Sequence, residues 1–163
     1  MAGGNTFFLS RPRRFGKSLL LSTIKAMMEG RRELFENMYI YDKIDWEPHP
    51  VVLLDMGKLD SSSPETVKHS LLSELQLQAK KFHIQLPDET LPNSALSAKV
   101  YALREKTGKQ VVLLVDEYDK PILDAMDDLP RADKIRDILR NFYTVIKSIS
   151  GDLRLTVLTG VYR

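Results

Sequence analysis

The hydrophobic residues of this chain form two kinds of pattern that follow one another along the sequence. Short unbroken runs of Val, Leu and Phe are typical of strands that are buried on both faces, as in parallel sheets. Apolar residues spaced three or four apart are typical of helices with one buried face. The runs that predict strands are residues 6–9, 51–55, 111–115 and 153–160. Because helical spacing separates them, the pattern predicts an α/β fold with a mainly parallel sheet.

The spacing of three and four predicts four main helices. The first follows Ser18 and stops near Gly30, the third begins near residue 93 or 94 and ends at Gly108, and the fourth covers residues 131–148. The second begins in residues 61–65, where two caps are possible. Ser62 with Glu65 fits a capping box, whereas Ser63 with Pro64 fits a cap followed by proline in the first turn. We expect residues 31–50 to form a short helix and irregular chain, and residues 122–130 to be an acidic loop.

Composition indicates one globular domain over residues 1–163. Hydrophobic residues make up 43% and charged residues 28%, and the net charge of +2 gives no electrostatic case for nucleic-acid or membrane binding. The absence of cysteine excludes disulfides, cysteine zinc sites and thiol catalysis. No apolar run approaches the roughly 18 residues that span a bilayer, and the start shows no secretory signal. We therefore expect a cytoplasmic protein without membrane contact.

The first strand run leads into a polar turn and then into Gly16, Lys17 and Ser18, which open an apolar helix. This is the layout of a nucleotide phosphate-binding loop, where backbone N–H groups and the helix dipole favour a bound phosphate. Lys17 would reach the β- and γ-phosphates, and the Ser18 hydroxyl would hold a magnesium ion. The predicted nucleotide-binding residues are Arg13, Arg14, Phe15, Gly16, Lys17 and Ser18.

One position departs from the usual loop. Arg11 stands five residues before Gly16, where glycine normally lets the chain turn sharply off the strand. Pro12, with its fixed φ, could set part of that turn, and the arginines add positive charge beside the phosphate site. Gly-Lys-Ser alone also fits an ordinary first helical turn, so its assignment depends on residues downstream.

The strand run 111–115 ends directly in Asp116 and Glu117. Ligands of open α/β sheets bind outside the carboxyl ends of the strands, so we expect this acidic pair beside the phosphate loop. Asp116 would hold magnesium, directly or through water, and Glu117 would polarise the attacking water. The alternative is a strand that ends in solvated acids; the combination with Lys17 and Ser18 favours the site.

Other polar residues near strand ends have less specific assignments. Thr159 could contact the γ-phosphate or the attacking water, or be structural. Asp119 and Lys120 could support the site or form a structural ion pair. Three charged residues near the end of the second strand run are interpreted as solvated loop side chains: Asp55, Lys58 and Asp60.

Residues 10–18, 116–121 and 158–161 together resemble the predicted AAA-ATPase-like domain family, P-loop ATPases of bacteria and archaea in the additional-strand group. The resemblance covers nearly the whole chain, and Arg11 is similar to the family's own form. It implies a P-loop three-layer sandwich that binds ATP and hydrolyses it with Mg²⁺. By position, the resemblance assigns five residues: Lys17 and Ser18 to phosphate and magnesium, Asp116 to magnesium, Glu117 to water activation and Thr159 to sensing.

Members of this family typically continue into a fifth strand and a helical region, and often carry a nuclease-like domain related to restriction endonucleases. Nothing in this sequence matches those parts. Since such sheets have the order 5-1-4-3-2, we expect four strands in the order 1-4-3-2, with residues 6–9 at an uncovered edge. The helical lid over adenine is also expected to be missing, so we expect a fragment of a longer protein.

Two classes of function follow. The first is a magnesium-dependent ATPase, for which Arg13, Arg14 and Arg163 are arginine-finger candidates. The second is a non-hydrolysing nucleotide-binding or scaffold module, or an inactive remnant. In either class, the resemblance points to a nuclease-like domain or another nucleic-acid-acting partner. Glu117 favours the enzyme, because a module that only binds nucleotide has no need of an acid there. A small-molecule kinase ranks lower, and the oligomeric state is not determined.

Overall fold

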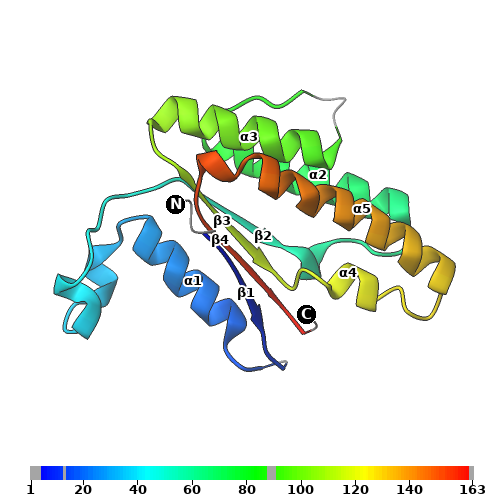
Figure 1. The fold of residues 1–163 in the computed structure, drawn as a ribbon, viewed down its shortest axis with the longest axis horizontal. Coiled ribbons are helices and arrows are strands. Elements are labelled where there is room, and N and C mark those ends of the chain that lie inside the picture. Colours follow the sequence, from blue (N-terminus) through cyan, green and yellow to red (C-terminus); the bar gives the residue numbers. More distant parts are fainter. Residues whose placement is uncertain (1–4, 13, 88–90, 162–163) are drawn as a thin grey trace.

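The fold is built on a parallel sheet of four strands, as the sequence predicts. The computed structural model describes residues 5–12, 14–87 and 91–161. The strands are β1 (Thr6–Ser10), β2 (Val51–Asp55), β3 (Val111–Asp116) and β4 (Leu153–Gly160). Their order is β1-β4-β3-β2, and every neighbouring pair is parallel (Figure 1). The predicted α/β class and strand order 1-4-3-2 are therefore confirmed.

The helices connect the strands. They are α1 (Lys17–Met28), α2 (Pro64–Lys81), α3 (Pro92–Thr107), α4 (Lys120–Leu123) and α5 (Leu129–Ser148). The short 3-10 turns are η1 (Arg32–Phe35), η2 (Tyr39–Asp42), η3 (Met56–Lys58) and η4 (Ser150–Asp152). Helix α4 is absent from the sequence prediction, because four residues are too few to show helical spacing. No helix in the described part of the chain is long and apolar enough to cross a bilayer.

Ser63 is the cap of α2. Its hydroxyl accepts a hydrogen bond from the N–H of Thr66 at 3.1 Å, and Thr66 Oγ1 accepts one from the N–H of Ser63 at 3.0 Å. Of the two starts that the sequence allows, the structure therefore has the serine cap followed by Pro64 in the first turn. The reciprocal partner is Thr66 rather than Glu65.

The sheet is the middle layer between two apolar cores. On one face α1 packs Leu21 against a small cluster of Val51, Val112, Leu114 and Val157. On the other face α2, α3 and α5 form the larger core with alternate residues of the same strands (Figure 1). All six residues of β3 are buried. Because side chains alternate along a strand, β3 contributes to both cores and fixes the centre of the molecule.

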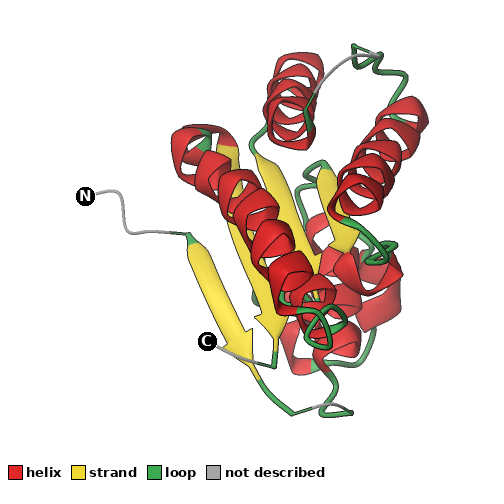
Figure 2. Ribbon diagram, turned by 90° about the vertical axis from the view of Figure 1, so that its right-hand side faces the viewer, coloured by secondary structure: helices red, strands yellow, loops and turns green. Residues whose placement is uncertain are grey.

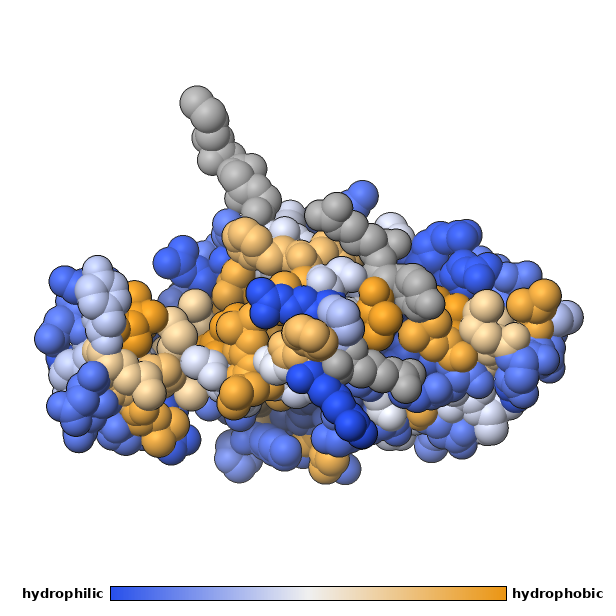
Figure 3. All heavy atoms as spheres, turned by 90° about the horizontal axis from the view of Figure 1, so that it is seen from below, coloured by the Kyte–Doolittle hydropathy of each residue, from blue (hydrophilic) through white to orange (hydrophobic). Residues whose placement is uncertain are grey.

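Strand β1 forms an exposed edge, as expected from the four-strand order. It pairs with β4, and its residues are exposed except for the half-buried Leu9. Phe7 and Phe8 are each 57% exposed. Figure 2 shows this strand, next to the N-terminus, standing clear of the helices. Seen from below, apolar surface crosses the middle of the molecule, on the side where Figure 1 places β1 and α1 (Figure 3).

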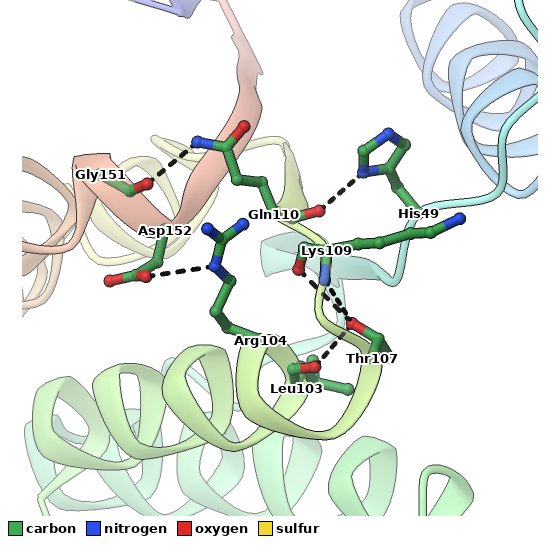
Figure 4. Close-up of polar contacts among 8 residues, drawn as sticks. All are labelled: His49, Leu103, Arg104, Thr107, Lys109, Gln110, Gly151 and Asp152. Atoms are coloured by element: carbon green, nitrogen blue, oxygen red, sulfur yellow. Dashed lines mark hydrogen bonds and ion pairs between the residues drawn. The ribbon is translucent and has the colours of Figure 1, made fainter.

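At the amino ends of the strands, polar contacts tie together the segments that enter the sheet (Figure 4). Gln110, before β3, donates its side-chain amide to the Gly151 carbonyl at 2.9 Å. The Gln110 carbonyl lies 2.9 Å from His49 Nδ1, before β2. Arg104 of α3 pairs with Asp152, before β4, at 3.7 Å. This edge of the sheet is therefore held by the protein's own groups.

Lys99 of α3 is completely buried against α2. Its ammonium lies 3.2 Å from Gln78 Oε1 and 3.5 Å from the Leu75 carbonyl. Gln78 in turn donates to the Leu53 carbonyl of β2 and to Glu74, both at 2.6 Å. Burial lowers the pKa of Lys99 from 10.5 to about 7, although Glu74 acts in the opposite direction. The buried ammonium is therefore a cost to the folded state at neutral pH.

We expect Lys99→Met to stabilise the protein near pH 7 and to weaken the pH dependence of its stability. Lys99 binds its proton less tightly in the folded protein, with a pKa of about 7, than in the unfolded chain, where it is 10.5. Between these values the unfolded state binds more protons, so the wild-type free energy of unfolding rises with pH. Urea unfolding across this range, with Lys147→Met as an exposed control, checks the slope. Parallel profiles for Lys99→Met and wild type would contradict the prediction.

Candidate functional site

The loop between β1 and α1 wraps around the side chain of Lys17. Lys17 is the first residue of α1, and its Nζ donates to the carbonyls of Arg11 at 2.8 Å and Pro12 at 3.0 Å. Arg14 and the N-cap Gly16 have left-handed φ values of 66° and 71°. No atom would meet a Cβ at Gly16, so the glycine there is favoured by its backbone angle and not by lack of space.

Arg11 is accommodated because the chain does not need glycine at this point. Arg11 is not among the described residues with a left-handed φ. Its N–H donates to the Gly160 carbonyl at 3.2 Å, which continues the pairing of β1 with β4 by one residue. The sharp turns of the loop come later, at Arg14 and Gly16. A side chain is therefore tolerated where the usual loop has glycine.

One pocket joins this loop to the end of β3. It has a volume of about 420 Å³ and is lined by Arg14, Gly16, Lys17, Ser18, Leu19 and Glu117. Lys17 and Ser18 come from the start of α1, whereas Glu117 directly follows β3. Residues that are far apart in the sequence therefore meet at the carboxyl edge of the sheet.

Asp116, the last residue of β3, directly precedes Glu117 but does not itself line the pocket, and its carboxylate is held in place. Asp116 Oδ1 accepts hydrogen bonds from Thr159 Oγ1 and, at 3.0 Å, from the N–H of Glu117. The N–H of Glu117 also faces Thr159 Oγ1 at 3.4 Å. Asp116 Oδ2 accepts no hydrogen bond from any residue that the structure describes. Thr159 is fully buried, so its contact with Asp116 orients that carboxylate.

The other sequence candidates lie away from the pocket or outside the described residues. Phe15 is 62% exposed and does not line the pocket. Arg13 and Arg163 lie outside the part of the chain that the structure describes. Lys120 pairs with Asp124 rather than with Asp119. Asp119 Oδ2 accepts a hydrogen bond from the N–H of Val161 at 2.9 Å, so it joins the turn after β3 to the end of β4.

The close packing of Tyr118 on Gly160 could not be predicted from the sequence. A Cβ at Gly160 would lie 2.4 Å from Tyr118 Cε1 and 2.8 Å from Asp119 Oδ1. The Tyr118 ring also meets Phe8 and Tyr143 edge to face, at centroid distances of 5.7 and 6.1 Å. In the sequence, both residues lie in motifs that resemble the family, but those motifs do not indicate this contact. Gly160 therefore allows the turn after β3 to lie directly on β4.

Tyr143 supports this turn from α5. Its hydroxyl donates to the Tyr118 carbonyl at 3.1 Å. Burial raises the pKa of the Tyr143 phenol well above its usual value of 10, so the phenol stays protonated and remains a donor. The backbone N–H of Tyr118 donates to the Thr159 carbonyl at 2.9 Å. The residues that follow Asp116 are therefore fixed on two sides.

We expect Gly160→Ala to destabilise the protein by about 1–3 kcal/mol, because the new methyl group overpacks the contact with Tyr118 and Asp119. Gly151→Ala is the matched control, since a Cβ there meets nothing within 4 Å. Thermal and urea unfolding of both variants would test this. Equal stability of the two variants would show that the turn after β3 can move away at little cost.

The comparisons with known proteins identify the family to which this chain belongs. No solved structure matches this chain. A curated relative from Azotobacter chroococcum mcd 1, described as an uncharacterised protein in the vnfD 5′ region, is 35% identical over 159 residues. The match covers 97% of this chain but 31% of the relative, so the chain spans about a third of that protein's length. The family described as Predicted AAA-ATPase matches residues 1–163, and the chain therefore belongs to this family of predicted ATPases.

Proposed function

We propose that this domain binds ATP together with magnesium and hydrolyses the γ-phosphate. The observation that carries the proposal is the single pocket shared by Lys17, Ser18 and Glu117. A cation, a hydroxyl and a carboxylate gathered at the start of a helix suit a triphosphate and an attacking water. Family membership supports nucleotide binding in general; magnesium and hydrolysis are the further steps that we propose.

Lys17 would hold the phosphates. Its ammonium has three N–H donors, of which two contact the Arg11 and Pro12 carbonyls. The third can reach an anion in the pocket without dismantling the loop. The first N–H groups of α1 have no acceptor within the helix, and the helix dipole favours negative charge at this end. Arg14 adds a positive charge on the pocket wall.

Ser18 and Asp116 are a suitable donor set for magnesium, which prefers oxygen ligands and keeps several waters. In the described residues no group of three acidic or histidine side chains forms a site by itself. The fit depends on Ser18, which lines the pocket, and on Asp116 Oδ2, which accepts no hydrogen bond from the described residues while Thr159 holds Oδ1. Ser18 and Asp116 would hold the ion, which would supply neutralisation of the charge that develops on the phosphates.

Glu117 is the proposed general base. Glu117 is one of the residues that line the pocket, and its backbone N–H is held by Asp116 Oδ1. From this position the carboxylate can orient a water and take its proton as that water attacks phosphorus. The use of this cycle by a nuclease-like domain or another nucleic-acid-acting partner is a proposal that rests on the family resemblance.

We expect Lys17→Ala to weaken binding of magnesium–ATP by about 10- to 100-fold, because it removes a charge-assisted contact to phosphate. Titration calorimetry on the folded chain measures the effect. Lys25→Ala is a matched control, because Lys25 lies on the same helix and pairs with Glu29 at the surface. Tight binding by Lys17→Ala would place the nucleotide elsewhere.

We expect Glu117→Gln to bind ATP as the wild type does but to release phosphate about 10²- to 10⁴-fold more slowly, since only the general base is lost. A steady-state phosphate assay beside the binding titration separates the two steps. If the wild type binds ATP and neither protein releases phosphate, the domain is a binding module and the proposed hydrolysis is wrong.

A further inference from the structure

The carboxylate of Glu117 rests on the turn that follows β2. An ideal Cβ built on Gly57 would lie 2.4 Å from Glu117 Oε2 and 3.4 Å from Glu117 Cδ. Gly57 is the middle residue of η3, which begins directly after β2. The carboxylate of Glu117, the proposed base, therefore packs against Gly57, a residue without a side chain in the turn after β2.

The backbone of Gly57 does not itself need glycine. Gly57 is not among the described glycines with a positive φ, in contrast to Gly16, Gly30 and Gly108. A residue with a side chain could take the same backbone conformation. A side chain would first meet the Glu117 carboxylate, which lies nearest, and then Asp55 Oδ1 at 3.1 Å. The glycine therefore bears on the position of Glu117 rather than on the folding of the turn.

The turn at Gly57 is held by contacts with the last residue of β2. Asp55, the last residue of β2, accepts a hydrogen bond from the N–H of Gly57 at 3.0 Å through Oδ1. Its other oxygen pairs with Lys58 Nζ at 3.2 Å. The strand register places Asp55 opposite Asp116, so the segments that follow β2 and β3 begin at the same level of the sheet. Met56, buried beside Gly57, anchors the turn in the core.

Glu117 is constrained from the β3 side as well. It has a left-handed φ of 52°, which is uncommon for a residue with a side chain. Its N–H is held by Asp116, and its carbonyl accepts from the N–H of Lys120 at 2.9 Å. With the Glu117 backbone fixed in this way, the position of its carboxylate depends on the choice of side-chain rotamer. Contact with Gly57 restricts that choice.

We propose that Gly57 is a positioning residue for the base: its bare Cα, held by Asp55, sets the direction in which Glu117 presents its carboxylate to the Lys17–Ser18 pocket. The proposal rests on the proposed hydrolysis and adds a residue to it. In the sequence, the segment after β2 looks like a loop of solvated charges. In the structure, Asp55 and Gly57 form the wall against which Glu117 lies.

The test is Gly57→Ala. The new methyl meets the ends of two flexible side chains, Glu117 first and then Asp55 Oδ1 at 3.1 Å. The variant should therefore fold with wild-type stability while Glu117, the nearer of the two, moves aside. We expect kcat for ATP to fall about 10- to 100-fold, as for a misplaced catalytic group, with the ATP dissociation constant unchanged. In the Glu117→Gln background, Gly57→Ala should cause no further loss, because the group on which it acts has been removed.

Gly151→Ala is the control, since it adds the same methyl where nothing lies within 4 Å. A Gly57→Ala enzyme with wild-type or higher kcat would overturn the proposal. So would an equal loss from Gly57→Ala in the Glu117→Gln background, since the effect would then not act through Glu117. Asp55→Ala, which releases the Gly57 N–H, should lower kcat in the same direction.

A second readout does not need turnover. The side-chain carboxylate ¹³C resonance of Glu117, identified by its loss in Glu117→Gln, should shift in Gly57→Ala and stay in place in Gly151→Ala. An unshifted resonance in Gly57→Ala contradicts the proposed role of Gly57 even if the domain hydrolyses ATP. If the resonance shifts but the domain has no ATPase activity, the contact between Gly57 and Glu117 is supported and the proposed hydrolysis is wrong.

Discussion

The rest of the structure depends on the burial of β3 between two parallel neighbours. All six of its residues are buried, and alternate side chains enter the core under α1 and the core under α2, α3 and α5. Sliding this strand by one residue would move every side chain into the opposite core and would require both cores to repack. The level at which Asp116 and Glu117 leave the sheet is therefore set by the packing of both cores, far from the pocket itself.

The end of β3 is also locked to the end of β4. Thr159 holds Asp116, the Thr159 carbonyl accepts from Tyr118, and Gly160 allows the tyrosine ring to lie on the strand. Each of these contacts joins segments that are about 40 residues apart in the sequence. Polar groups fixed in this way before a ligand arrives need little reorganisation when charge develops. Such preorganisation is what a phosphate-handling site requires.

The two edges of the sheet have different roles. At the amino edge, Gln110 and its neighbours use their polar groups on one another, and the contacts join the entry segments. At the carboxyl edge, the first N–H groups of α1 have no acceptor within the helix, and Lys17 uses two of its three donors on the Arg11 and Pro12 carbonyls. Because parallel strands all point the same way, the N–H groups at the start of α1 and the acids that end β3 lie at this one edge.

The sequence by itself determined the class of fold, the four strands and the two ends of the candidate site. Strand runs of apolar residues and the Gly-Lys-Ser start of a helix are local signals, and they predicted where Lys17, Ser18, Asp116 and Glu117 would stand relative to their own strands. The tertiary structure alone decided what those residues touch. Three contacts join separate strands: Glu117 packs on Gly57, the Tyr118 ring packs on Gly160, and Thr159 donates a hydrogen bond to Asp116. Contacts of this kind depend on register and side-chain packing across the sheet, for which one strand's sequence has no signal.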